Sequence, residues 1–274
     1  YRTDLTDEDE PDFFNATAME EHTVVATGAE EFQPAFSPDG AEVAYLEDRT
    51  TLKVVNLASG EARTILPGDL PYSYADGDQW YRWSPDGRWF LVEFLSPTRW
   101  SSEVGLVAAD GSGEVSNLTR SGYEDVAPRW AGDGEVVVWL TDRHGDRVQA
   151  GWPSQFDVYA AYLTREAWDR HQLTEAELEQ VKAAEKKDDT EESGKEDGED
   201  GDDDTNGDTP ELPDPVAVEL AGLEDRTTRL SLHSADLAGA LLTQDRETLV
   251  YLARFEKGYD LWTHELRGKE TKRL

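Results

Sequence analysis

Two arginines are the side chains in this sequence whose type and spacing best suit chemistry. Arg82 and Arg129 lie 47 residues apart, and each directly precedes a tryptophan, Trp83 or Trp130. If the tryptophans are buried between layers of structure, strand alternation turns the arginines the opposite way, toward an open channel. A guanidinium pair there suits a carboxylate, such as the C-terminus of a peptide. Arg82 and Arg129 are therefore the predicted peptide-binding residues.

A structural role for the same arginines is the alternative. Acids recur at the same spacing, and an ion pair between each arginine and one of them would connect neighbouring repeats. These acids are Glu31, Asp78 and Asp125. The ion-pair interpretation needs no ligand, so it is the default against which peptide binding must be tested.

Motifs for covalent catalysis are missing from the sequence. It contains no Gly-x-Ser-x-Gly, Ser-x-x-Lys or His-Glu-x-x-His motif, and it has no cysteine. Five histidines lie far apart, and His144, in the charged turn TDRHGD, is interpreted as a solvent-exposed turn residue. We therefore predict no catalytic residue and no cofactor in this chain.

A calcium-like motif occurs in the acidic segment DDDTNGD. Asp202, Asp204 and Asn206 match the opening of a calcium-binding loop, but Pro213 stands where a bidentate glutamate is needed. The segment belongs to a low-complexity run in which residues 185–208 hold 13 acids and 3 bases. We interpret it as a solvated acidic loop and predict no metal site.

The two arginines belong to a repeat built on a Ser-Pro-Asp-Gly hairpin. The segments FQPAFSPDGAEVAYLE, WYRWSPDGRWFLVEFL and VAPRWAGDGEVVVWL align without gaps at a spacing of 47. Proline, aspartate and glycine suit successive positions of such a turn. Three positions of the aligned repeats define the blades, and we call each set of equivalent residues a column. The blade-defining columns are Phe36, Trp83 and Trp130; Asp39, Asp86 and Asp133; and Gly40, Gly87 and Gly134.

Each repeat has the strand content of one β-propeller blade. The first unit predicts strands at 33–36, 42–47, 52–57 and 62–66, and four short antiparallel strands in about 45 residues are typical of a blade. A fourth unit has a degenerate turn at 242–246, but its end, DLWTHELRGKETKRL, matches the first unit. The fold class is all-β, a propeller with about four to five blades that form an incomplete ring.

The rest of the chain is divided around these blades. Residues 1–31 are an acidic lead-in with a leftover outer strand at 22–27, and residues 32–274 form the blades. An insertion at 164–215 contains a helix at 164–187, in which Thr174 and Glu177 form a capping box, followed by the acidic segment. Strands are expected again at 216–220 and 227–233.

The composition excludes some partners. Sixty acidic and 26 basic residues give a net charge of −34, which disfavours nucleic acid and anionic membranes, and no apolar run reaches 18 residues. Only 8 of the bases are lysine, a composition typical of halophilic proteins, whose stability rises with salt. The chain starts without methionine, so we expect it to be part of a longer protein.

The sequence resembles the propeller region of tricorn-type serine peptidases. The resemblance rests on GDQWYRWSPDGRWFLVEF, on DVYAAYLTREAWDR before a charged insertion, and on ARFEKGYDLW, and it covers residues 32–274. It implies a non-catalytic propeller that gates or binds oligopeptides for a peptidase core, which follows a PDZ domain later in the parent chain. No catalytic residue of the family maps onto this sequence.

TolB-like propellers share the Ser-Pro-Asp-Gly hairpin, so a protein-interaction scaffold is the alternative function. The family resemblance implies a cytoplasmic location, with the periplasm as the alternative. Two blade faces left open by an incomplete ring would favour a homo-oligomer.

Overall fold

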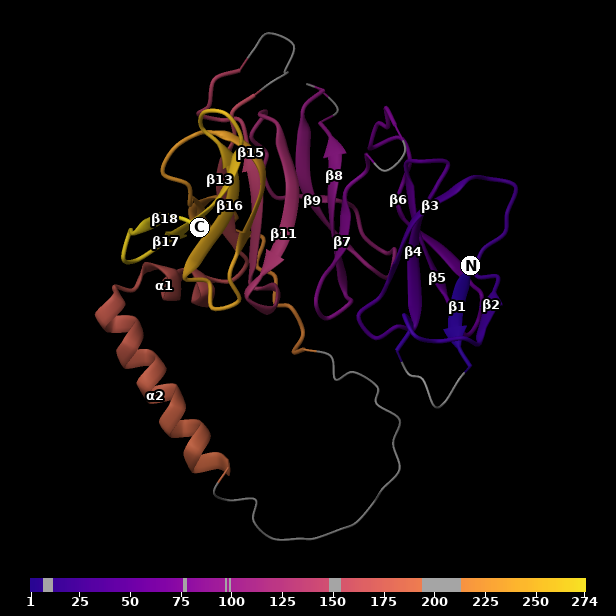
Figure 1. Ribbon diagram of the computed structural model, residues 1–274, viewed down its shortest axis with the longest axis horizontal. Coiled ribbons are helices and arrows are strands. Elements are labelled where there is room, and N and C mark those ends of the chain that lie inside the picture. Colours follow the sequence, from indigo (N-terminus) through magenta and orange to yellow (C-terminus); the bar gives the residue numbers. More distant parts are fainter. Residues whose placement is uncertain (7–11, 76–77, 97, 99, 148–153, 194–212) are drawn as a thin grey trace.

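The computed structural model describes residues 1–6, 12–75, 78–96, 98, 100–147, 154–193 and 213–274. Four antiparallel sheets of four strands each stand side by side in an open arc (Figure 1). The predicted propeller of four-stranded blades is confirmed, and blades 1 and 4 lie at opposite ends of the arc.

The blades follow the chain in order. Blade 1 contains β3 (Glu31–Phe36), β4 (Glu42–Glu47), β5 (Thr51–Asn56) and β6 (Ala62–Leu66). Blade 2 contains β7 (Tyr81–Trp83), β8 (Trp89–Leu95), β9 (Ser102–Ala108) and β10 (Ser116–Asn117). Blade 3 contains β11 (Asp125–Ala131), β12 (Val136–Thr141), β13 (Asp157–Tyr162) and β14 (Thr227–Arg229). Blade 4 contains β15 (Asp236–Leu242), β16 (Thr248–Arg254), β17 (Tyr259–Glu265) and β18 (Thr271–Arg273).

The Ser-Pro-Asp-Gly turns are held by the aspartate hydrogen bonds that their sequence predicts. In blade 1 the Ser37 hydroxyl and the Ala41 N–H both donate to Asp39, at 2.5 and 3.0 Å, and Gly40 takes a positive φ of 70°. These hydrogen bonds lower the pKa of Asp39. Blade 2 repeats the arrangement, with Asp86 accepting from Ser84 at 2.5 Å.

The third and fourth turns depart from this pattern in opposite ways. In blade 3 the segment Gly132–Gly134 forms a 3-10 turn in which Asp133 itself takes a positive φ of 55°. In blade 4, where the sequence is degenerate, Thr243 donates to Asp245 at 2.6 Å and Arg246 takes the positive φ expected of glycine. The fourth turn therefore keeps the geometry of the first although its residues differ.

Apolar side chains from adjacent blades form three separate cores. Between blades 1 and 2, Leu52 and Val54 pack with Phe90 and Val92. Leu91 and Leu106 pack with Val137 between blades 2 and 3, and Val138 packs with Leu249 between blades 3 and 4. Because each core needs side chains from two blades, the stability of one blade depends on its neighbours.

The aromatic column behaves differently at the first blade. Trp83 and Trp130 are half-buried at blade junctions, and the Trp83 indole donates to the Ala35 carbonyl at 3.3 Å. Phe36, the equivalent residue of blade 1, is exposed. The described structure has no full blade before Phe36 that could cover it.

The amino-terminal segment differs from the prediction. The expected strand at 22–27 is wrong: the structure instead pairs β1 (Arg2–Leu5) with β2 (Met19–His22) as a separate two-stranded sheet. Val24 and Val25 follow without strand pairing and pack on Val43 and Tyr45 of blade 1. Burial of these valines explains the apolar pattern that suggested a strand.

The insertion in blade 3 contains two helices in place of the predicted single one. Helix α1 (Arg165–Gln172) begins at Thr164, whose hydroxyl accepts from the Ala167 N–H at 3.1 Å. Helix α2 (Glu175–Ser193) begins at the predicted capping box, where the Thr174 N–H donates to Glu177 at 2.8 Å. Figure 1 shows α2 projecting away from the blades.

The chain returns to blade 3 without the strand predicted at 216–220. The Val216 N–H donates to Asp86 of blade 2 at 2.7 Å, and the Glu219 N–H donates to the Leu163 carbonyl at 2.9 Å. The segment therefore packs across blades 2 and 3 and does not extend a sheet. Strand β14 ends at Arg229, before the predicted end at 233.

Candidate functional site

The two predicted arginines meet on one aromatic ring. The Arg82 guanidinium lies 4.7 Å from the centre of the Trp80 ring, and the Arg129 guanidinium lies 5.3 Å from the same centre. Arg82 is on β7 and Arg129 is on β11, the edge strands with which blades 2 and 3 begin. We call Arg82, Arg129 and Trp80 the arginine pair site.

Hydrogen bonds across the junction fix the ring and the strand that carries Arg129. The Trp80 indole donates to the Pro128 carbonyl at 2.9 Å. Strand β11 has a bulge between Val126 and Arg129, where Ala127 takes a positive φ of 53°. The Ala127 N–H donates to Glu93 of β8 at 2.6 Å, so the bulge is held from blade 2.

Glu93 is the most strongly perturbed acid near this site. Burial raises the pKa of Glu93 to about 7, and the nearby Glu124 adds to the rise, while the bond from Ala127 opposes it. Burial likewise raises the pKa values of Glu124 and Asp125. The junction behind the arginine pair site thus contains three acids whose pKa values are raised by burial, and the pKa of Glu93 reaches about 7.

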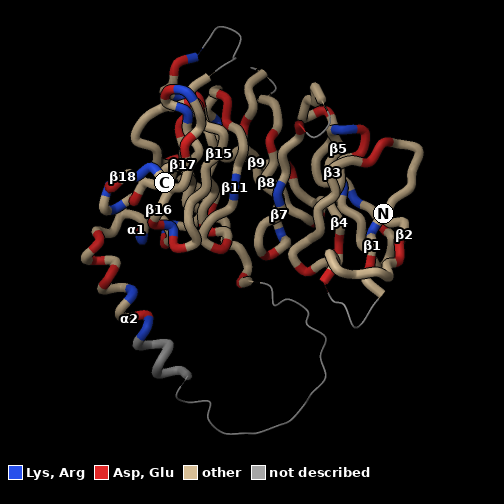
Figure 2. Tube along the Cα trace, viewed as in Figure 1, with Lys and Arg blue, Asp and Glu red and all other residues tan. Residues whose placement is uncertain are grey.

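The arginine pair itself is short of negative charge. Arg82 is exposed and Arg129 is half-buried, and burial together with the neighbouring Arg82 lowers the pKa of Arg129. Among the residues that the structure describes, neither guanidinium forms an ion pair. Figure 2 shows blue segments on β7 and β11, in a trace that is mostly tan with scattered red segments.

The recurring acids have other partners, so the ion pairs of the default interpretation are not formed by these residues. Glu31 accepts from the Thr27 hydroxyl at 2.6 Å, and Asp78 accepts from the Ala75 N–H at 2.9 Å. Asp125 accepts from the Trp139 indole at 3.1 Å. The sequence showed that the acids recur, but it did not show toward which partners their carboxylates point.

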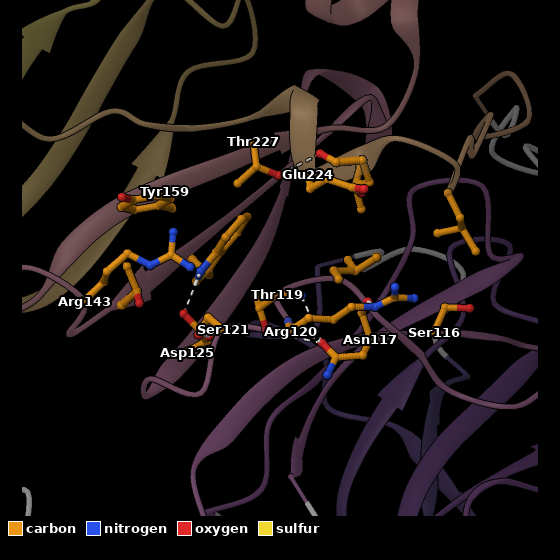
Figure 3. A pocket seen from close by; sticks show the side chains of 15 residues that line it. Ser116, Asn117, Thr119, Arg120, Ser121, Asp125, Arg143, Tyr159, Glu224 and Thr227 are labelled. Atoms are coloured by element: carbon orange, nitrogen blue, oxygen red, sulfur yellow. Dashed lines mark hydrogen bonds between the residues drawn. The ribbon is translucent and has the colours of Figure 1, made fainter. Parts of the chain in front are cut away.

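A cavity of about 280 Å³ opens on the other side of the same blade junction (Figure 3). Buried Asp125 and Trp139 line it together with Tyr159, Arg120 and Arg143. Asp125 is satisfied within the chain, and the Arg143 guanidinium lies 5.4 Å from the Tyr159 ring centre. Sequence analysis missed this cavity, because its walls come from segments as far apart as Ser116 and Thr227.

The remaining candidates offer little chemistry. His144 is exposed, as expected, and bonds the Tyr159 hydroxyl at 2.7 Å. The calcium-like residues Asp202, Asp204 and Asn206 lie outside the described residues. Within the described ranges, no group of three or more His, Cys, Asp or Glu side chains is placed to bind a metal ion. No described helix is long and apolar enough to cross a membrane.

Comparison with known proteins supports the architecture. No protein-family model matches the sequence. A 130-residue segment is 25% identical to the "Uncharacterized peptidase YuxL" of Bacillus subtilis (strain 168). The match covers 46% of this chain and 20% of that protein. The crystal structure of the tricorn protease aligns with a TM-score of 0.57 and 11% identity, over 89% of this chain and 22% of that one.

TolB from Acinetobacter baumannii aligns with a TM-score of 0.49 and 14% identity, over 94% of this chain and 46% of that one. The chain thus spans about a fifth of the length of the peptidase and of the tricorn protease that it matches. The propeller fold of this chain is therefore similar to part of the tricorn protease.

Proposed function

We propose that this chain is the non-catalytic propeller of a tricorn-like serine peptidase, and that it holds oligopeptides by their C-terminal carboxylate at the arginine pair site. The observation that carries the proposal is the stacking of Arg82 and Arg129 on Trp80 without a carboxylate partner among the described residues. The similarity of a segment to a peptidase and of the fold to the tricorn protease supports the same class of parent protein.

The chemistry of the site favours a small anion. Two cations near one ring repel each other, and a carboxylate between them removes that repulsion while forming charge-assisted hydrogen bonds. The indole face holds the guanidinium groups in place by cation–π contact, so less side-chain entropy is lost on binding. A surface with a net charge of −34 repels acidic ligands elsewhere, which confines them to this site.

Peptide binding measured by calorimetry tests the proposal. A short neutral peptide with a free C-terminus should bind at least about tenfold more tightly than its amidated form, a difference of about 1.4 kcal/mol. The double variant Arg82→Ala/Arg129→Ala should lose this difference. The matched control is Arg120→Ala/Arg143→Ala, which removes two arginines from the 280 Å³ cavity and should keep the preference for the free acid.

Four outcomes would contradict the proposal. Equal affinity for acid and amide peptides, or unchanged affinity of the Arg82→Ala/Arg129→Ala variant, would remove the carboxylate site. Failure of all peptides to bind would favour the interaction scaffold. Peptide hydrolysis by this chain that is lost on mutation of one of its own serines would show that it is catalytic.

A further inference from the structure

Two oppositely charged side chains, Arg143 and Glu224, line the 280 Å³ cavity without pairing with each other (Figure 3). Among the residues that the structure describes, neither side chain forms an ion pair. Asp142, the acid next to Arg143 in the chain, instead lies 3.9 Å from the Arg147 guanidinium. The cavity therefore presents one positive and one negative group that no described residue neutralises.

The Arg143 guanidinium is held by aromatic rings. Its central carbon lies 5.4 Å from the ring centre of Tyr123 and 5.4 Å from that of Tyr159. Cation–π contacts fix the group but use none of its N–H donors, so these donors are available to a carboxylate. Arg120 also lines the cavity, but it is exposed and its Nε donates to the Asn117 carbonyl at 3.3 Å. Arg143 is therefore the better carboxylate partner.

Glu224 is held in place by the turn that carries it. It belongs to η2 (Leu223–Arg226), a 3-10 turn with which the insertion returns to blade 3. The buried Arg226 fixes this turn, because its guanidinium donates to the carbonyls of Tyr162 and Ala221, both at 3.1 Å. The Glu224 side chain is exposed at the cavity, where its carboxylate suits an ammonium group.

The other lining groups are satisfied or apolar. Asp125 is buried, and its two oxygens accept from the Ser121 hydroxyl and the Trp139 indole. Leu118, Leu223 and Trp139 are all buried and supply apolar surface to the cavity. Its volume is close to the lower limit of about 300 Å³ for ligand pockets, so the cavity suits one small molecule and not a long peptide.

We propose that this cavity binds a free amino acid with an apolar side chain. Arg143 receives its carboxylate, Glu224 receives its ammonium group, and the apolar wall receives its side chain. A zwitterion gives both charged groups a partner, whereas a simple carboxylate leaves Glu224 unpaired and a simple amine leaves Arg143 unpaired. A zwitterion also escapes the long-range repulsion that a net charge of −34 imposes on anions.

Calorimetric titration with L-phenylalanine tests the proposal, in molar KCl so that the general attraction of cations to the acidic surface is screened. Two analogues each lack one charge: phenethylamine has no carboxylate, and 3-phenylpropanoate has no ammonium group. Phenylalanine should bind at least about tenfold more tightly than phenethylamine, since it gains a charge-assisted hydrogen bond to Arg143. It should bind about threefold more tightly than 3-phenylpropanoate, because the pair with the exposed Glu224 is weaker.

One variant for each charge shows which side chain makes the difference. Arg143→Gln should no longer distinguish phenylalanine from phenethylamine, and Glu224→Gln should no longer distinguish it from 3-phenylpropanoate. Asp225→Asn, at the exposed neighbour of Glu224, is the matched control and should bind all three compounds like the parent. Circular dichroism melts check that the variants are folded. If Arg143→Gln unfolds, Glu224→Gln at its exposed position still carries the test.

The proposal has clear ways to fail. It is overturned if phenylalanine does not bind up to about 10 mM, if either analogue binds as tightly as phenylalanine, or if Glu224→Gln keeps the parent's preferences. The Arg82→Ala/Arg129→Ala variant should bind phenylalanine like the parent. Loss of phenylalanine binding in that variant would place the amino acid at the arginine pair site and overturn the proposal for the cavity, whereas the difference between acid and amide peptides tests the arginine pair site by itself.

Discussion

Leu52 and Leu261 occupy the same position in blades 1 and 4 and have opposite surroundings. Leu52 is buried by Phe90 and Val92 of blade 2, whereas Leu261 is 42% exposed on blade 4. A repeat therefore specifies the side chain at a position but not its contribution to stability, which depends on the neighbouring blade. The same holds for charge, since Asp125 is buried whereas Glu31 and Asp78, which recur at the same spacing, are exposed.

The largest expected effect is a difference in stability between alanine variants of Leu52 and Leu261. Leu52→Ala should lower the free energy of unfolding by roughly 2 to 5 kcal/mol, because it leaves a cavity in a packed junction. Leu261→Ala should change it by less than about 0.5 kcal/mol, because the Leu261 side chain is exposed and its loss leaves no cavity. Chemical denaturation in molar KCl measures both. Similar costs for the two variants would contradict the dependence of a leucine's contribution on the neighbouring blade.

A smaller effect on the free energy of unfolding is expected from the titration of Glu93, at the junction of blades 2 and 3. The pKa of Glu93 rises from 4.5 to about 7 on folding, so between these values the folded state keeps a proton that the unfolded state has lost. The free energy of unfolding should therefore fall as the pH rises from about 4.5 to 7, by on the order of 3 kcal/mol, and change little from this cause above pH 7.

The variant Glu93→Gln separates this contribution from the rest of the protein. Glutamine does not titrate, so the loss of stability between pH 5 and 8 should be smaller in the variant than in the parent. Glu256→Gln, on the exposed surface of blade 4, is the matched control and should follow the parent. If denaturation curves give the same pH dependence for all three proteins, Glu93 does not titrate in this range.

The smallest effect on stability per residue is expected from the acidic side chains on the surface. Excess acid repels itself in dilute buffer and is screened at molar salt, where the Debye length is about 3 Å. We expect the melting temperature to rise between 0.1 M and 2 M KCl by at least roughly 2 to 4 °C, which corresponds to about 1 kcal/mol. A flat or falling melting temperature would contradict the halophilic interpretation.

Much of the fold could be predicted because it rests on local chemistry. The Ser37–Asp39 and Ser84–Asp86 turns close by hydrogen bonds between residues two positions apart, and the capping box of α2 spans three. Strands β4 and β6 have the predicted bounds, because alternation and turn residues fix both ends of a short strand. The fourth turn has a degenerate sequence, with Arg246 where the other repeats have glycine, but Asp245 still accepts a hydrogen bond from the Glu247 N–H at 3.1 Å.

The site could be predicted only in part. The spacing of Arg82 and Arg129 marked both residues, but Trp80, which brings them together, is outside the columns that define the repeat. The bulge at Ala127 is held by Glu93, 34 residues earlier in the chain. No pattern of neighbouring residues encodes such a contact.

The sequence by itself thus determined the number of repeats, their turns and the positions of the two arginines, because these depend on residues close together in the chain. Only the tertiary structure decided which acids turn away from the arginines, which tryptophan they share, and which leucines stay uncovered. These features depend on how one blade docks on the next, and docking is set by the packing of side chains that lie tens of residues apart.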